Sequence, residues 1–264
     1  MQEPEEYGPQ ALNLRPDSPS IGLMNTYFFG GPITRTVKAL ISINIGVFVL
    51  QFLASHLLDT NFIDVYFGLV PNSVTEHLML WQFVTYMFLH GGFFHIFFNM
   101  LTLFMFGNEM ERYWGTPRFL NYYFVTGIGA GLCSWVVAPH STAVVIGASG
   151  AIYGLLLAYG LAYPNRIVYV NFLLPIKVKW LVLIMGAMAF LSSLGGAESG
   201  VANIAHLGGM VIGYLFLRGK DWYDKYHYFN EQRQREQLKR QFEVYYGDVR
   251  RKIEADKKKP PTIH

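Results

Sequence analysis

Charged side chains are scarce in this sequence, and their scarcity excludes an ordinary soluble domain. Asp, Glu, Lys and Arg make up 15% of the 264 residues, whereas a soluble globular domain carries about 25%. The shortage is concentrated in long stretches: 37–55 holds Lys38 alone, and no charge occurs in 93–106, 119–138, 145–163, 180–197 or 201–217. About 20 mostly apolar residues cross a bilayer as a helix. We therefore predict an all-α polytopic membrane protein, a bundle of six transmembrane helices.

Lys and Arg are missing altogether from three segments between the predicted spans, 57–92, 138–147 and 196–202. All 21 basic residues lie in the N-terminal region, in the 107–118 and 164–179 loops, or from Arg218 onward. Cytoplasmic loops of membrane proteins carry the excess of Lys and Arg. The pattern predicts that the three segments are exterior and that both termini are cytoplasmic.

Other absences narrow the chemistry. The single cysteine, Cys133, excludes a disulfide framework and a cysteine-based metal site, and we interpret it as a small buried apolar residue. His90 and His95 are five residues apart with no acid between them, which argues against the His-Glu-x-x-His motif of a metalloprotease. The interiors of the predicted spans also lack the charged coupling residues expected of a transporter. No cofactor or metal is expected.

The two flanks differ from the apolar centre, which suggests segments 1–33, 34–218 and 219–264. The first is polar and lacks the basic n-region of a signal peptide, so we expect a poorly ordered cytoplasmic segment. No organelle-targeting presequence is visible, and a bacterial inner membrane is the simplest location. The last segment holds 12 basic and 8 acidic residues, which predicts a charged cytoplasmic tail with a solvated helix at Asn230–Tyr245. Its mixed charges argue against a nucleic-acid partner.

The exterior segment between residues 56 and 90 is too apolar for a freely solvated loop. Its apolar and aromatic side chains are Phe62, Val65, Tyr66, Phe67, Leu78, Met79, Leu80 and Trp81. Irregular backbone is tolerated at membrane depth only where it packs on protein. We predict short amphipathic helices at the outer leaflet, with Trp81 and Tyr86 as interface anchors. An ordinary extracellular loop is the alternative.

Polar side chains inside apolar helices are functional candidates, because a membrane interior penalises them. His95 and Asn99 are four residues apart and share one helix face. Ser149 lies in Gly147-Ala148-Ser149-Gly150, where a loop enters a helix, and His206 lies near the start of another. In the predicted orientation all four side chains reach a similar depth, near the outer side.

Small residues explain how two of these helices could meet. They recur every four residues on two faces: Gly150, Gly154 and Ala158, and Ala205, Gly209 and Gly213. Small-xxx-small faces let helix backbones approach closely in membranes. If the two faces pack together, Ser149 and His206 come within hydrogen-bonding distance, and the histidine can activate the serine as a general base.

An oxyanion formed by such a nucleophile needs donors. The candidates are the Ser149 backbone N–H at the helix start and the side chains of His95 and Asn99. Each signal alone also fits a structural role: Gly-x-Ser-Gly and the small faces fit helix packing, a lone histidine fits a structural residue, and His90 fits a helix-start or interface residue. Their coincidence at one depth favours catalysis.

The chain resembles the rhomboid family of intramembrane serine proteases between about Thr36 and Arg218. The resemblance rests on the six-helix pattern with a long first exterior loop and on four motifs in family order. These are His-x-x-x-Asn at His95 and Asn99, Glu-x-x-x-Gly at Glu111 and Gly115, Gly-x-Ser-Gly at Gly147–Gly150, and Ala-His-x-x-Gly-x-x-x-Gly at Ala205, His206, Gly209 and Gly213.

The resemblance implies a catalytic Ser149–His206 dyad without an acidic third member. It implies that His95 and Asn99 serve the oxyanion and that Tyr153 packs against His206. Family members cleave single-spanning membrane proteins near the outer end of the substrate helix, favouring small residues at the cut and helix-destabilising residues nearby. Water would reach the serine from outside, and the fifth helix with the loop Gly195–Val201 would form the gate for lateral substrate entry.

Two departures from the family pattern stand out. The family commonly has Trp-Arg in the first exterior loop, whereas Trp81 is followed here by Gln82, which bears on the rigidity of that loop rather than on the chemistry. The tail 219–264 has no counterpart in the minimal core. A catalytically inactive rhomboid-like scaffold is the alternative function. The sequence assigns neither the substrate nor the oligomeric state.

Overall fold

The computed structural model describes residues 32–57, 61–170, 174–194 and 200–219, with the pairs 238–239 and 246–247. Residues 1–217 form one compact unit and residues 218–264 another, and each is considered by itself. Three predictions therefore fall largely outside the described residues. They concern the N-terminal segment 1–33, the helix Asn230–Tyr245 and the gate loop Gly195–Val201.

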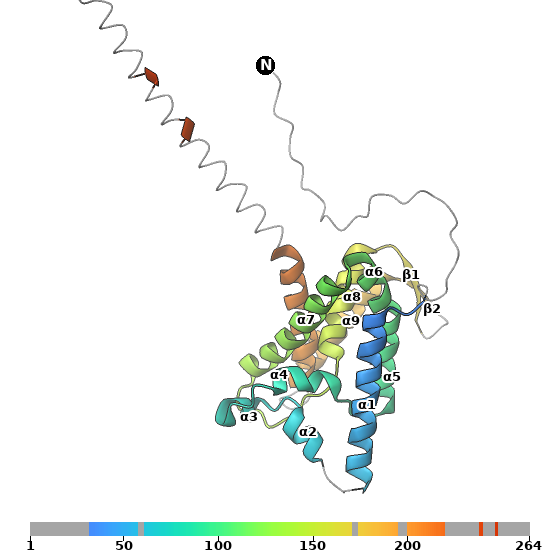
Figure 1. The fold of residues 1–264 in the computed structure, drawn as a ribbon, viewed down its shortest axis with the longest axis vertical. Coiled ribbons are helices and arrows are strands. Elements are labelled where there is room, and N and C mark those ends of the chain that lie inside the picture. The colour runs from blue at the N-terminus through green and yellow to red at the C-terminus, as the bar shows by residue number, and fades with distance from the viewer. Residues whose placement is uncertain are drawn as a thin grey trace, which may run out of the picture. The chain divides into compact units, whose positions relative to one another are not determined.

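Helices dominate the first unit, as predicted (Figure 1). The first apolar stretch corresponds to α1 (Arg35–Leu57). The second is a composite helix made of α5 (Phe93–Thr102), the π-helical turn η2 (Leu103–Gly107) and α6 (Asn108–Trp114). The other four correspond to α7 (Thr116–Val137), α8 (Ser149–Ala162), α9 (Val178–Ser193) and the helix Gly200–Gly219. By length and composition, α1, α7 and Gly200–Gly219 can each cross a membrane. The composite helix raises the number to four if it is counted as one span with the helices preceding it.

Of the six predicted spans, three or four are thus supported within the described residues. The two remaining apolar helices, α8 and α9, have 14 and 16 residues, fewer than the roughly 20 that span the hydrocarbon core. Among the described residues, the two strands that the structure contains were not predicted. Within the predicted 164–179 loop, β1 (Ile167–Val170) pairs antiparallel with β2 (Leu174–Lys177), and the β-branched and aromatic side chains of β1 suit a strand.

The exterior segment is built from short helices, as predicted. These are α2 (Phe62–Phe67), α3 (Pro71–His77), α4 (Gln82–Thr85) and the 3-10 turn η1 (Tyr86–Phe88). Trp81 is 39% exposed, and its indole N–H donates to the Tyr66 carbonyl at 3.0 Å. The prediction that Tyr86 is an interface anchor was wrong. Tyr86 is 1% exposed, and its hydroxyl donates to the buried Gly127 carbonyl at 2.6 Å.

Gln82, at the position where the family commonly has Arg, holds the exterior segment together. Its side chain is fully buried. The Val70 N–H donates to its Oε1 at 2.9 Å, and its Nε2 donates to the Val65 and Tyr66 carbonyls at 3.3 Å each. Gln82 lacks the charge of the family motif. Its neutral amide instead satisfies backbone groups that would otherwise be buried without partners.

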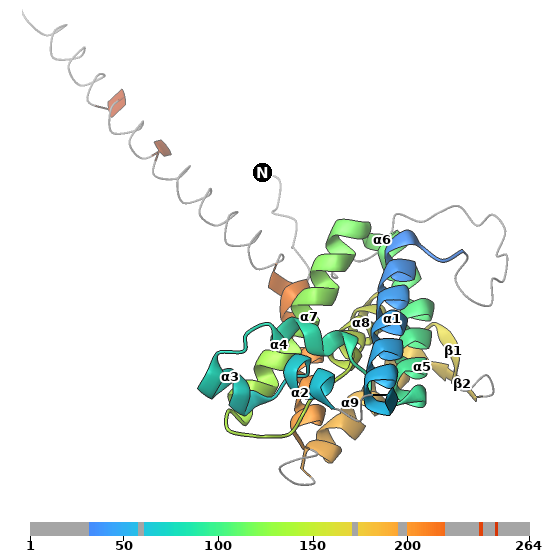
Figure 2. The same ribbon diagram turned by 60° about the horizontal axis from the view of Figure 1, so that its bottom comes forward.

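A sharp bend turns the chain from the exterior helices into the bundle. The segment Gln82–Phe88 and the composite helix Phe93–Trp114 lie at 96° to each other. Figures 1 and 2 both show α5 beside α1, and α5 also contacts α8. The bend thereby brings the start of α5, which carries His95, to the helix that begins with Ser149.

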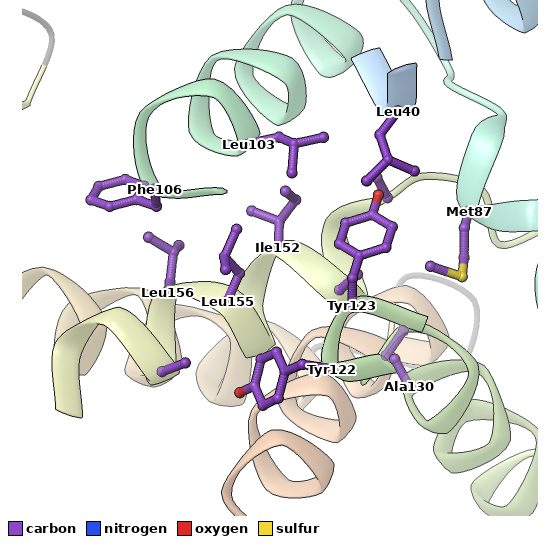
Figure 3. Close-up of a cluster of buried hydrophobic side chains, with 14 of the residues drawn as sticks. Leu40, Met87, Leu103, Phe106, Tyr122, Tyr123, Ala130, Ile152, Leu155 and Leu156 are labelled. Carbon is purple, nitrogen blue, oxygen red and sulfur yellow. The ribbon is translucent and has the colours of Figure 1, made fainter. Parts of the chain in front are cut away.

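The core of the unit surrounds α8. Figure 3 shows Ile152, Leu155 and Leu156 of α8 among side chains of other elements. The labelled neighbours come from α1, η1, η2 and α7: Leu40, Met87, Leu103, Phe106, Tyr122, Tyr123 and Ala130. Because close-packed side chains on several sides leave a helix little freedom to move, the first residue of α8 is held in a fixed position.

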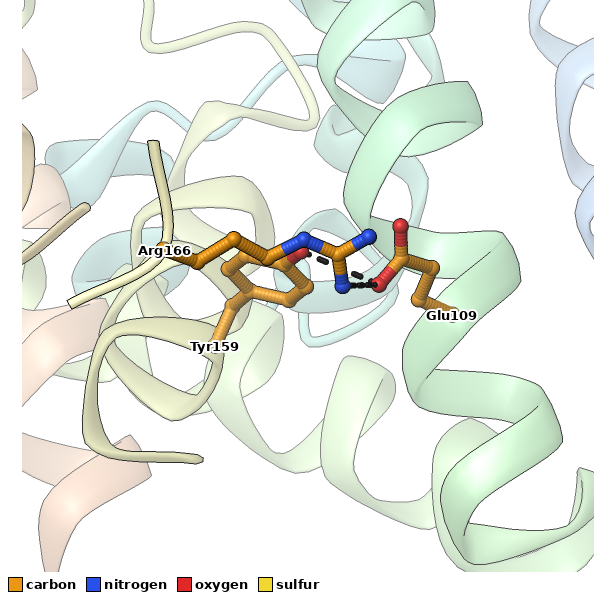
Figure 4. A network of polar contacts seen from close by, with 3 residues as sticks. All are labelled: Glu109, Tyr159 and Arg166. Carbon is orange, nitrogen blue, oxygen red and sulfur yellow. Dashed lines mark hydrogen bonds and ion pairs between the residues drawn. The ribbon is translucent and has the colours of Figure 1, made fainter. Parts of the chain in front are cut away.

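Polar contacts fix the end of α8 farthest from Ser149. Glu109 of α6 accepts hydrogen bonds through one oxygen from the Tyr159 hydroxyl at 3.0 Å and from Arg166 at 2.5 Å (Figure 4). The Arg166 guanidinium also lies over the Tyr159 ring, 5.9 Å from its centre. These contacts connect α6 to the last turn of α8 through Tyr159 and to the residue before β1 through Arg166.

Glu111, in the Glu-x-x-x-Gly motif, joins the beginnings of two helices. One carboxylate oxygen accepts hydrogen bonds from the Thr34 hydroxyl at 2.5 Å and the Val37 N–H at 3.3 Å, and the other accepts from the Thr116 hydroxyl at 2.7 Å. Gly115 has a φ of +78°, a conformation that glycine adopts without a steric penalty. The motif therefore has a structural function, because a carboxylate is favourable at helix N-termini.

Candidate active site

Ser149 is the first residue of α8, and the turn before it requires a glycine. Gly147 has a φ of +125°, in the region that favours glycine. A Cβ at Gly147 would lie 2.8 Å from both Cε1 and Nε2 of His95 and 3.6 Å from the Ser149 Oγ. The Gly147 N–H donates to the Tyr86 carbonyl at 2.9 Å. The turn thus brings the imidazole of His95 and the hydroxyl of Ser149 to the same place.

His206 lies across from the serine on the helix Gly200–Gly219. Its Nε2 is 2.8 Å from the Ser149 Oγ, a hydrogen bond between residues 57 apart in sequence. The ring of Tyr153, one turn below Ser149 on α8, stacks on the imidazole with centroids 4.4 Å apart and an interplanar angle of 4°. The stacking restricts the orientation of the imidazole, so that Nε2 stays directed at the hydroxyl.

The close approach of these two helices depends on glycine, as predicted. A Cβ at Gly209 would lie 2.0 Å from the carbonyl oxygen of Gly150, and one at Gly154 would lie 3.0 Å from the carbonyl oxygen of Gly209. Gly213 was predicted to share this face, but the atoms nearest to it belong to α7: a Cβ there would meet the Tyr122 hydroxyl at 2.4 Å. At Gly213, the space that a side chain would need is therefore taken by α7.

His95 is oriented by the backbone just before α5. The Gly91 N–H donates to His95 Nδ1 at 3.2 Å. In a neutral imidazole, the nitrogen that accepts a hydrogen bond carries no proton, so the other nitrogen does. The proton of His95 is therefore on Nε2, the atom beside Gly147. This arrangement makes His95 a hydrogen-bond donor toward the space next to Ser149.

Asn99 is buried one turn after His95, and its Nδ2 donates to the His95 carbonyl at 2.8 Å. Within the part of the chain that the structure describes, no hydrogen bond joins Asn99 directly to Ser149. One of its two amide hydrogens is thus used inside α5, and the second remains for another acceptor.

No cluster of three or more His, Cys, Asp or Glu side chains suited to a metal ion is found among the described residues. Cys133 is half-buried on α7. A Cβ at Gly208 would meet its Cβ at 2.7 Å, so the cysteine packs against the helix that carries His206.

Two residues near the site were missed in the sequence. Tyr86 had been predicted at the interface, and nothing in its sequence context indicated that its carbonyl fixes Gly147. Gln51 of α1 is buried, and its Oε1 accepts a hydrogen bond from the backbone N–H of His90 at 3.0 Å. Gln51 gave a usable signal, because a polar side chain in a stretch with a single charged residue is a functional candidate.

Comparison with known proteins gives a consistent result. The Rhomboid domain family matches residues 77–219. Rhomboid protease AarA of Providencia stuartii is 31% identical over 204 residues, which cover 70% of this chain and 72% of AarA. Rhomboid protease GluP of Bacillus subtilis is 37% identical over 153 residues, 57% of this chain and 28% of GluP. RHOMBOID-like protein 5 of Arabidopsis thaliana is 30% identical over 150 residues, 56% of this chain and 46% of that protein.

The match thus covers most of AarA but less than half of the other two relatives. Two of these relatives are named as rhomboid proteases, and the apolar helices described above make this chain an integral membrane protein. With more than half of its residues inside the family match, the chain belongs to the rhomboid family.

Proposed function

We propose that this protein is an intramembrane serine endopeptidase that cleaves single-spanning membrane proteins near the outer end of their transmembrane helix. The observation that carries the proposal is the 2.8 Å separation between Ser149 Oγ and His206 Nε2, with Tyr153 stacked on the imidazole. A serine becomes a competent nucleophile when an adjacent base takes its proton. Ser149 is the proposed nucleophile and His206 the proposed general base.

In the first step, the Ser149 Oγ–H bond breaks as Oγ bonds to the substrate carbonyl carbon, and the proton moves to His206 Nε2. The carbonyl electron pair becomes an oxyanion. Re-formation of the carbonyl expels the amine of the cleaved peptide bond, which takes the proton from Nε2. Water then attacks the acyl-enzyme with the same base, which releases the acid product and restores Ser149.

The oxyanion needs donors that are in place before it forms. The Ser149 N–H is suited because the first N–H groups of a helix lack intrahelical acceptors. The Nε2–H of His95 and the second amide hydrogen of Asn99 are the proposed side-chain donors. Gly147, Gly150 and Gly209 would support the site by leaving room for His95 and for the helix contact.

We further propose that both termini are cytoplasmic, from the distribution of Lys and Arg. The proposed location is a bacterial inner membrane, the simplest one for this chain. The protease domain would be residues 34–218, with 1–33 and 219–264 as cytoplasmic flanks. The proposed partners are transmembrane substrates and the surrounding lipid.

A fluorophosphonate probe tests the proposed nucleophile. An activated serine displaces fluoride from phosphorus and becomes covalently labelled, so we expect the protein in detergent or liposomes to be labelled at Ser149. Ser149→Ala should abolish labelling. Ser141→Ala is the matched control, because it removes a hydroxyl from the preceding loop, and it should label normally. Equal labelling of the Ser149→Ala variant would refute the assignment, and a folded wild-type protein without any label would favour the inactive scaffold.

A further inference from the structure

A buried glutamine on α1 connects the exterior helices to the backbone that orients His95. Gln51 is 8% exposed. Its Nε2 donates to Asp64 Oδ1 of α2 at 2.6 Å, and its Oε1 accepts the His90 N–H at 3.0 Å. Both ends of the amide are therefore used, and the amide cannot rotate without breaking two hydrogen bonds.

The next residue along the chain continues this connection to the site. Gly91 follows His90 directly, and its N–H donates to His95 Nδ1 at 3.2 Å. The His90 ring also meets the His95 ring edge to face, with centroids 5.1 Å apart. Because the two peptide units are adjacent, holding the His90 N–H also limits the direction in which the Gly91 N–H points.

We infer that Gln51, held by Asp64, is a positioning residue for His95. The inference rests on the proposed function, because it assigns the network an effect on the oxyanion. Gln51 fixes the His90–Gly91 backbone, the Gly91 N–H holds the proton of His95 on Nε2, and Nε2 lies beside Gly147 and Ser149. A helix that contributes no catalytic group thereby contributes to transition-state stabilisation.

The first test is Gln51→Leu, which keeps a similar volume and removes both hydrogen bonds. Losing one oxyanion donor costs about 10²–10³-fold in kcat, and a misdirected donor should cost less, so we expect kcat to fall by roughly 10-fold. KM should stay within about twofold of the wild type, since interactions made only in the transition state affect kcat. A purely structural role would instead lower the thermal stability without lowering kcat selectively at an unchanged KM.

A rescue experiment keeps the inference testable if Gln51→Leu folds poorly. Gln51→Glu alone places a second carboxylate beside Asp64 and should lower kcat. Combining Gln51→Glu with Asp64→Asn restores both hydrogen bonds, because the new amide donates to the new carboxylate, which still accepts the His90 N–H. We expect the double variant to recover most of the wild-type kcat.

A double-mutant cycle tests whether Gln51 acts through His95. In a His95→Ala background, Gln51→Leu should lower kcat by less than twofold further, because the group that it positions is already gone. Asn44→Leu is the matched control: it removes a buried amide from the same helix, one that donates to the Leu40 carbonyl of its own helix, and it should keep wild-type kcat.

The outcomes separate the inference from the proposed function. Unchanged kcat in Gln51→Leu, no rescue in a folded double variant, or independent multiplication of the His95→Ala and Gln51→Leu effects would each overturn the inference. Wild-type activity in Ser149→Ala would instead overturn the proposed function.

Discussion

Replacing His206 by Phe is expected to lower kcat/KM by about 10⁴-fold, the upper end of what a positioned general base contributes. The large effect follows from the proposed dyad, in which one imidazole handles the proton in both acylation and deacylation. Phe keeps an aromatic ring to stack on Tyr153 and to fill the space between the two helices. It removes both ring nitrogens, including the Nε2 that lies 2.8 Å from the Ser149 Oγ.

The measurement is cleavage of a fluorogenic single-span substrate in liposomes, with thermal unfolding in detergent recorded beside it. His77→Phe is the matched control, since it makes the same change at an exposed histidine that ends α3, and its kcat/KM should equal the wild-type value. The dyad assignment fails if the His206→Phe variant cleaves within tenfold of the wild-type rate.

Gly209→Leu is expected to prevent correct assembly of the bundle. Even a Cβ at this position would lie 2.0 Å from the Gly150 carbonyl oxygen and 2.8 Å from its carbonyl carbon. Overpacking usually costs about 1–3 kcal/mol because side chains can shift. Here the obstacle is the backbone of α8, so the helices themselves must separate, and we expect a loss of more than about 3 kcal/mol in the free energy of unfolding.

Gly46→Leu provides the comparison for this experiment. Gly46 lies on α1, and a Cβ there would meet no atom within 4 Å. Both variants are purified in the same detergent, and their folded fraction and melting temperature are compared. We expect Gly46→Leu to melt at or above the wild-type temperature and Gly209→Leu to aggregate or melt far below it. A Gly209→Leu protein that melts like the wild type would contradict the close contact of the two helices.

The fold and the Ser149–His206 contact were predictable because their signals are local. Missing charges define the apolar helices, and small residues every four positions mark a face where backbones can meet. The pattern did not indicate that Gly213 faces α7, because spacing alone does not say which neighbouring helix a small residue meets. That depends on the tertiary arrangement, which turns Gly213 toward Tyr122 of α7.

Features that depend on the partner of a polar group were not predictable. Tyr86 reads equally well as an interface residue or a core residue until its hydroxyl finds the Gly127 carbonyl. Gln82 lacks the charge of the family motif, and only the structure reveals that its amide satisfies three backbone groups. The hairpin of β1 and β2 lies in a loop predicted only from its charges. In each case the deciding contact joins residues that no sequence pattern relates.

Cleavage of a single-span model substrate in liposomes by the wild-type protein and by Ser149→Ala tests the central claim most directly. Ser149→Ala removes one hydroxyl at a half-buried position beside glycines, so its melting temperature should stay close to the wild-type value. The account predicts cleavage near the outer end of the substrate helix by the wild type and none by the variant. Equal cleavage by both proteins would contradict it, because peptide-bond hydrolysis would then proceed without Ser149.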